Sequence, residues 1–151
     1  MALQRPMQFR WDVTSPVQQL MVISKNKLWV YDKDLEQITV RSLTRAAGEI
    51  PGLLLSDAHP LLNKDFYVTE VSKTATQNRV FLLRAKNPNN LFASIQMVFK
   101  NQVIDQMQLT DFSGQLTLIR FNHIRMNNPL DARLFRFVPP PGVDIIDETK
   151  R

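Results

Sequence analysis

A regular alternation of apolar and polar side chains runs through residues 7–13, which read MQFRWDV. The apolar members, from Met7 to Val13, would fall on one face of an extended chain and the polar members on the other. A period of two is typical of a β-strand that buries one face. Pro16 is expected to end this strand, because proline has no backbone N–H to give to a sheet. The stretch therefore predicts a protein built mainly from strands.

The same pattern recurs on both sides of a segment without it. Apolar runs separated by short polar turns predict three further strands, and hence an antiparallel meander, at residues 20–23, 28–31 and 37–41. A second group is expected at residues 66–71, 80–86, 92–100, 103–110 and 115–124. Between the groups, at residues 42–64, the sequence predicts short helical turns. Pro51 suits the first position of one turn, which needs no N–H donor.

Several predicted strands are apolar on both faces. Val80 and Leu82 would point to one side of the sheet, and Phe81 and Leu83 to the other. A sheet that is covered on one side only does not need this pattern. Two interpretations stay open: the middle helical segment covers the second face as ordinary core, or that face lines a cavity for a hydrophobic ligand.

Composition argues against several classes of function. The 151 residues include no cysteine, which excludes a disulfide framework and a cysteine nucleophile. No apolar run approaches the roughly 18 residues of a transmembrane helix. Neither His59 nor His123 has metal ligands at a suitable spacing, and the four glycines form no phosphate-binding loop. We therefore predict a protein that is not an enzyme and that has no catalytic residue, metal or cofactor.

The chain carries 19 Lys and Arg against 14 Asp and Glu, a net charge of +5. The tightest basic groups are pairs, such as Lys25 with Lys27, and no block of five or six occurs. We therefore expect no nucleic-acid partner, although a basic β-sheet protein that binds polyanions stays open as an alternative function.

Short motifs occur in a fixed order along the chain. They are Arg5-Pro6, Phe9-Arg10-Trp11, Leu28-Trp29-Val30-Tyr31, Glu36-Gln37, Thr39-Val40-Arg41, Pro51 with Leu53-Leu54-Leu55-Ser56, Asp65-Phe66, Pro129-Leu130-Asp131, Phe135-Arg136-Phe137 and Pro139-Pro140-Pro141-Gly142-Val143-Asp144. Together they resemble the outer-membrane lipoprotein carrier family, LolA, of Gram-negative bacteria. The resemblance runs from about Leu3 to Asp144.

The resemblance implies a fold and a function. Members of the family are periplasmic and have an incomplete antiparallel β-barrel, whose short helices form a lid over a hydrophobic cavity. The cavity holds the acyl chains of lipoproteins, which the carrier takes from an inner-membrane ABC transporter and delivers to an outer-membrane receptor. We accordingly expect a periplasmic carrier that moves lipoproteins from the inner to the outer membrane. The alternative within the same fold is the outer-membrane lipoprotein receptor.

The resemblance also implies roles for single residues. Arg5 matches an arginine that, in the family, hydrogen-bonds lid carbonyls and latches the lid shut. The matching lid residues are Pro51, Leu53, Leu54, Leu55 and Ser56. Phe9 matches a position implicated in lipoprotein transfer, and Trp11 is a candidate for the cavity wall. Further candidates for the acyl-chain cavity, whose direction depends on strand register, are Met21, Phe81, Leu83, Ile95 and Met97.

The beginning of the chain departs from the family pattern. Family members begin with a signal peptide, an amphipathic helix and one or two strands before the Arg-Pro motif. We therefore expect residues 1–151 to form a single lipoprotein-carrier domain that is truncated at its N-terminus, by a misassigned start, by trimming or as a remnant. Loss of the first helix would expose the cavity and a sheet edge, which invites pairing with another chain. The periplasmic location calls for a signal peptide, which this sequence does not show.

Overall fold

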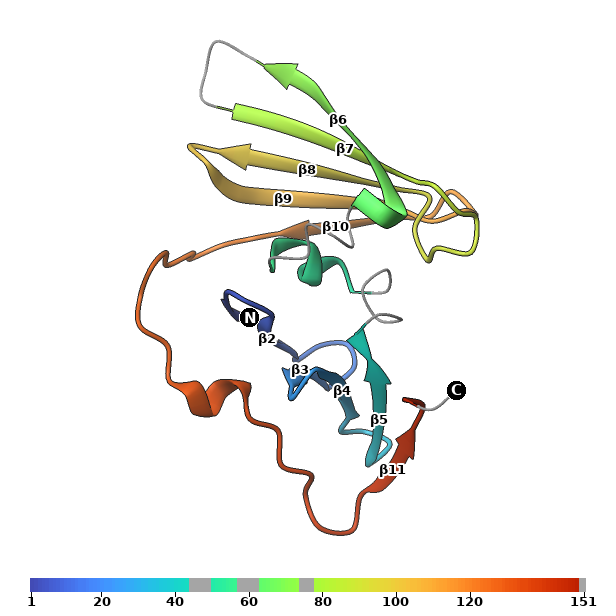
Figure 1. Cartoon of the computed structure of the whole chain (residues 1–151), viewed down its shortest axis with the longest axis vertical. Coiled ribbons are helices and arrows are strands. Elements are labelled where there is room, and N and C mark those ends of the chain that lie inside the picture. The colour runs from blue at the N-terminus through green and yellow to red at the C-terminus, as the bar shows by residue number, and fades with distance from the viewer. Residues whose placement is uncertain (44–49, 57–62, 74–77, 150–151) are drawn as a thin grey trace. The chain divides into compact units, whose positions relative to one another are not determined.

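The protein divides into two compact units, each with one β-sheet (Figure 1). The computed structural model describes residues 1–43, 50–56, 63–73 and 78–149. The first unit joins Met1–Ala58 with the C-terminal segment Pro129–Arg151, and the second unit is His59–Asn128.

The sheet of the first unit has the strand order β1-β2-β3-β4-β5-β11. Its strands are β1 (Ala2–Gln4), β2 (Gln8–Val13), β3 (Gln19–Ser24), β4 (Lys27–Asp32), β5 (Gln37–Ser42) and β11 (Asp144–Asp147). Strands β2 to β5 form an antiparallel meander, which confirms the prediction from the alternating pattern. Strand β1, which pairs with β2, was not predicted. Lys25 and Asn26 form the two-residue turn between β3 and β4, and both have positive φ, as tight hairpin turns require.

Strand β11 is the one strand of this sheet that pairs in parallel, and the sequence did not predict it. Strand β11, red in Figure 1, lies beside β5, and Ile145 is opposite Ile38. Its four residues read DIID and are all exposed, so no buried alternation marks them as a strand. Arg41 of β5 donates to the carboxylate of Glu148 at 2.9 Å, just beyond the strand. The partner strand is distant in sequence, and local patterns do not specify such pairings.

The C-terminal segment covers one face of this sheet. The short 3₁₀ helix η2 (Ala132–Phe135) contacts β2 and β3, and Phe135 is buried. On the same face the ring of Phe137 lies 5.3 Å from that of Trp29, between centroids. Arg10, also on this face, donates from Nη1 to the carbonyl of Leu134 at 3.4 Å. The C-terminal segment therefore supplies one layer of the first unit's core, above the buried side chains of Leu20, Val22, Ile38 and Val40.

The 3₁₀ helix η1 (Pro51–Leu55) packs on the opposite face of the sheet. Its first residue is Pro51, which confirms the prediction that this proline opens a helical turn. Ile50 precedes it in an extended conformation. The other predicted helical turns, near residues 46–48 and 59–62, lie outside the described residues.

The second unit is a five-stranded antiparallel sheet in the order β10-β9-β8-β7-β6 (Figure 1). Its strands are β6 (Phe66–Lys73), β7 (Asn78–Ala85), β8 (Ser94–Lys100), β9 (Val103–Thr110) and β10 (Leu116–Arg120). All five match predicted strands, but the prediction for residues 115–124 was too long. After Arg120, the N–H of Phe121 donates to the carbonyl of Asp105, and His123 adopts positive φ, so the chain leaves the sheet.

Alternation along these strands gives the second sheet one apolar face and one mainly polar face, here called the polar face. Val80, Leu82 and Val98 also lie on the polar face, so strand β7 is apolar on both sides, as its sequence predicted. The apolar face contains Leu83, Ile95, Met97, Met107 and Leu109, all of which are buried. The described part of the chain is thus mainly β, with two sheets and no closed barrel, as the predicted class of an incomplete antiparallel barrel requires. Among the described helices, none is long and apolar enough to cross a membrane.

Candidate functional site

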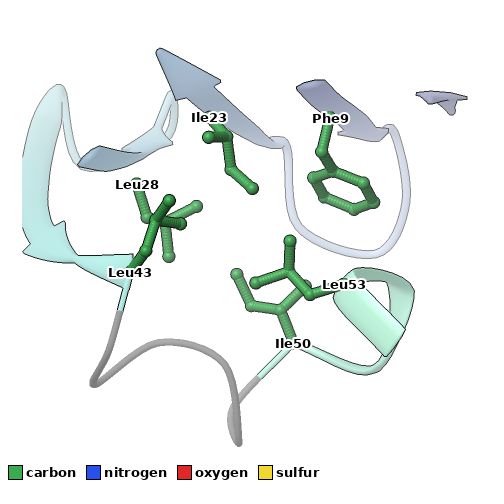
Figure 2. Close-up of a cluster of buried hydrophobic side chains, with 6 residues drawn as sticks. All are labelled: Phe9, Ile23, Leu28, Leu43, Ile50 and Leu53. Atoms are coloured by element: carbon green, nitrogen blue, oxygen red, sulfur yellow. The ribbon is translucent and has the colours of Figure 1, made fainter. Parts of the chain in front are cut away.

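The candidate site in the first unit is an apolar surface of the sheet that η1 covers. Figure 2 shows Leu53 and Ile50 directed from η1 and its entry toward Phe9 of β2, Ile23 of β3 and Leu28 of β4. Leu43 completes this cluster, and all six side chains are at most 6% exposed. Burial of leucine and phenylalanine from water stabilises such a contact by roughly 1.5–3 kcal/mol per side chain. In this structure η1 is therefore closed over the sheet.

Gly52 allows η1 to approach the sheet closely. A Cβ atom at this position would lie 2.8 Å from both Cε2 and Cζ of Phe9, and 3.0 Å from Cε3 of Trp11. Carbon atoms in contact are normally about 3.5–4.0 Å apart. The rings of Phe9 and Trp11 meet edge to face, with centroids 6.1 Å apart. The absent side chain of Gly52 thus makes room for two aromatic rings.

Ser56 closes the C-terminal end of η1. Its backbone N–H and its hydroxyl both donate to the carbonyl of Leu53, at 3.0 Å and 2.8 Å. Ser56 is itself fully buried, so its hydroxyl needs this partner. Of the predicted lid residues, Leu53 and Ser56 are buried, whereas Pro51, Leu54 and Leu55 are half-buried.

Arg5 lies in the turn between β1 and β2, and its side chain is exposed. The hydrogen bonds among the described residues do not include one from its guanidinium to Leu55 or Ser56. The latch that the resemblance implies therefore stays a prediction.

Trp11 and Met21 are direct cross-strand partners at the margin of the cluster, where Leu3, Met7 and Val30 also pack. Register thus brings Phe9, Trp11, Met21 and η1 together on one face. Sequence reasoning did not select four residues of this cluster: Ile23, Leu28, Leu43 and Ile50. The turn at residues 25–26 could have identified two of them, because it places Ile23 opposite Leu28.

The four candidates in the second unit also share one face. Phe81 lies opposite Met97, and Leu83 lies opposite Ile95, on strands β7 and β8. Leu83, Ile95 and Met97 are buried, and Phe81 is half-buried. Two residues of β9 extend the same surface without having been predicted, Met107 and Leu109. The period of two within residues 103–110 is the signal that could have found them.

An ion pair borders this apolar face beside Phe81. The guanidinium of Arg79 lies 4.8 Å from the ring centroid of Phe81, and it donates to the Glu70 carboxylate at 2.9 Å and 3.1 Å. The hydrogen bond to Glu70 raises the pKa of Arg79 above its usual value. The ring of Phe99 meets Phe81 edge-on, with centroids 5.8 Å apart. A fixed charge pair and two rings therefore mark where the apolar face ends.

The side chains gathered in both units are aliphatic and aromatic. Surfaces of this kind bind hydrocarbon through the removal of apolar area from water, which requires no chemical step. Among the described residues, no group of three His, Cys, Asp or Glu could hold a metal ion. His123 is exposed in the segment after β10.

The comparisons with known proteins agree on one family. A profile described as "Outer membrane lipoprotein carrier protein LolA" matches residues 1–138. The chain is similar to the outer-membrane lipoprotein carrier proteins of Legionella pneumophila (strain Corby), at 38% identity, and of Azotobacter vinelandii, at 41% identity. Both alignments cover 148 residues and 98% of this chain, and they cover 72% and 70% of the two relatives.

A solved structure supports the fold alone. It is a chain from the complex of the CwlD amidase from Clostridioides difficile with the GerS lipoprotein. The similarity has a TM-score of 0.52 at 12% sequence identity and covers 81% of this chain and 71% of that one.

Proposed function

This chain belongs to the LolA family of outer-membrane lipoprotein carrier proteins, and from that premise we propose that it binds the acyl chains of lipoproteins and carries them through the periplasm. The observation that carries the proposal is the family match together with the aromatic and aliphatic surface around Phe9, which η1 covers. The family and the names of these relatives point to a carrier rather than an enzyme.

The energetics of acyl chains explain why a carrier is needed. Each CH₂ group that leaves a membrane for water costs about 0.8 kcal/mol, so a lipoprotein with several long chains is held by tens of kcal/mol, roughly. An apolar protein surface lowers this barrier because it replaces the membrane interior as the environment of the chains. The apolar faces of both units supply such surface, from Phe9, Trp11 and Met21 in one unit and from Phe81, Leu83, Ile95 and Met97 in the other.

The helix η1 would act as a lid that regulates affinity. The surface around Phe9 is occupied by Leu53 and Ile50 when η1 is closed, so acyl chains must displace them. Only molecules with an open lid bind cargo, so the apparent affinity is the intrinsic affinity multiplied by the fraction of open molecules. Moderate affinity matters to a carrier, because cargo that bound too tightly could not be released. In this proposal, cargo comes from an inner-membrane ABC transporter and goes to an outer-membrane receptor, with Arg5 as the latch of the lid.

Displacement of a fluorescent acyl probe tests the proposal. Purified protein is titrated with the probe, and an acylated lipoprotein is then added, with the same lipoprotein lacking its acyl chains as the control. We expect saturable probe binding that the acylated form reverses and the non-acylated form does not. Binding that neither form displaces would contradict the proposed function.

A further inference from the structure

The positive charge of the protein is concentrated in one unit. Residues 59–128 hold eight Lys and Arg against four Asp and Glu, a net charge of +4 out of +5 for the whole chain. The binding of acyl chains does not explain this excess, because acyl chains carry no charge.

Several of these cations lie on the polar face of the second sheet. Register places Arg84 of β7 beside Tyr67 of β6, and Arg120 of β10 beside Gln106 of β9. The middle of this face combines amide and hydroxyl side chains, Ser94, Gln96, Gln108 and Thr110, with the apolar side chains of Val80, Leu82 and Val98. Exposed apolar side chains flank it on the two edge strands: Tyr67 on β6, and Leu116 and Leu118 on β10.

The carboxylates of these five strands do not offset the cations of the polar face. The strands contain two, Glu70 and Asp105. Glu70 is bound by Arg79, and Asp105 forms an ion pair with Lys100 at 2.9 Å. Within the described part of the chain no carboxylate pairs with Arg84 or Arg120, so their charges can attract an anionic partner.

Lys86 adds a cation whose position is fixed. Its Nζ donates to the carbonyl of Asn63 at 2.6 Å and lies 4.9 Å from the ring centroid of Tyr67. Tyr67 is 64% exposed, so much of its side chain is open to solvent beside the ammonium group. An aromatic ring with a polar tip next to a cation is the combination that favours the interface between lipid headgroups and water.

We propose that the polar face of the second sheet, with Arg84, Lys86 and Arg120, docks on the surface of an anionic lipid bilayer. Basic residues near such a surface are attracted to its negative potential, and the apolar side chains on both edge strands can enter the headgroup region. The amide and hydroxyl side chains of this face suit contact with a hydrated, laterally mobile layer of headgroups. The proposal goes beyond the binding of cargo and does not depend on it.

Sedimentation with lipid vesicles tests this proposal. The cargo-free protein is mixed with vesicles of phosphatidylethanolamine with phosphatidylglycerol, or of phosphatidylcholine alone. The double variant Arg84→Gln/Arg120→Gln is compared with Lys25→Gln/Arg136→Gln, which removes the same charge from exposed residues of the first unit. Circular dichroism confirms that each variant is folded.

We expect the native protein to bind the anionic vesicles only. Each cation removed from the polar face should weaken this binding about fivefold, so the double variant Arg84→Gln/Arg120→Gln should bind roughly 25-fold more weakly. The first-unit variant should lose much less. Equal loss in both double variants, equal binding to phosphatidylcholine, or retention on heparin without vesicle binding would overturn the proposal. Displacement of the acyl probe is measured in solution without vesicles. A protein that does not bind vesicles can therefore be distinguished from one that does not bind cargo.

Discussion

Gly52 and Phe9 approach each other so closely that a Cβ on Gly52 would lie 2.8 Å from the tip of the Phe9 ring. Phe9 is fully buried, so its ring has little room to move away. We predict that Gly52→Ala destabilises the closed position of η1 and lowers the free energy of unfolding by about 1–3 kcal/mol. The same change should strengthen the binding of an apolar probe, because more molecules are open. Urea denaturation and probe titration measure the two effects.

The control for this prediction is the background Phe9→Leu, which removes the ring atoms closest to Gly52. The cost of Gly52→Ala should be smaller in that background than in the native chain, although the 3.0 Å approach to Trp11 remains. Equal costs in both backgrounds would show that the contact with Phe9 does not determine how closely η1 packs.

Leu53 and Leu54 are neighbours in η1 with different environments. Leu53 is 1% exposed, whereas Leu54 is half-buried. We predict that Leu53→Ala lowers the free energy of unfolding by about 2–5 kcal/mol, since it leaves a cavity in the cluster around Phe9. Leu54→Ala should cost clearly less. Chemical denaturation of both variants measures the difference, and similar costs would contradict the observed packing of η1.

Phe135 anchors the C-terminal segment on the first sheet. We predict that Phe135→Ala lowers the free energy of unfolding by about 3–5 kcal/mol, because the ring is buried against β2 and β3. Val138, three residues later, is 80% exposed, and Val138→Ala should change stability by at most about 0.5 kcal/mol. If Phe135→Ala proved equally harmless, the C-terminal segment would not be part of the core.

Phe81 is the half-buried candidate for cargo binding in the second unit. We predict that Phe81→Ser weakens binding of the acyl probe about tenfold, because it removes one aromatic side chain from the apolar face. Leu118→Ser, on the polar face of the same sheet, should leave probe binding unchanged. A fluorescence titration of both variants decides this, and an equal effect would show that the apolar face is not the binding surface.

Asp131 caps η2, and this cap predicts a dependence on pH. Its carboxylate accepts from the Arg133 backbone N–H at 2.9 Å and from the Arg133 guanidinium, and the hydrogen bonds to Arg133 lower the pKa of Asp131 below 3.8. The stabilisation is therefore present above pH 3.8 and is lost as pH falls through the lowered pKa. We predict a lower melting temperature for Asp131→Asn near neutral pH, and a difference that shrinks in acid. A difference that stayed constant with pH would count against the charged cap.

The sequence by itself determined the local structure. Alternation at residues 7–13 and in the later runs identified β2 to β5 and the five strands of the second sheet, and Pro51 identified the start of η1. These features depend on the spacing of apolar residues and on backbone chemistry within a few positions. The same spacing put Phe81 and Leu83 on one face, although only the paired register showed that Ile95 and Met97 share it.

Only the tertiary structure decided which distant segments meet. It paired β11 with β5 and laid Phe135 over the first sheet, and neither contact leaves a signal in the local pattern. It also showed why a glycine suits position 52, because the rings of Phe9 and Trp11 from β2 occupy the space that a side chain there would need. Such contacts depend on how the chain is brought together over long separations, where burial and shape, rather than local spacing, determine which side chains fit.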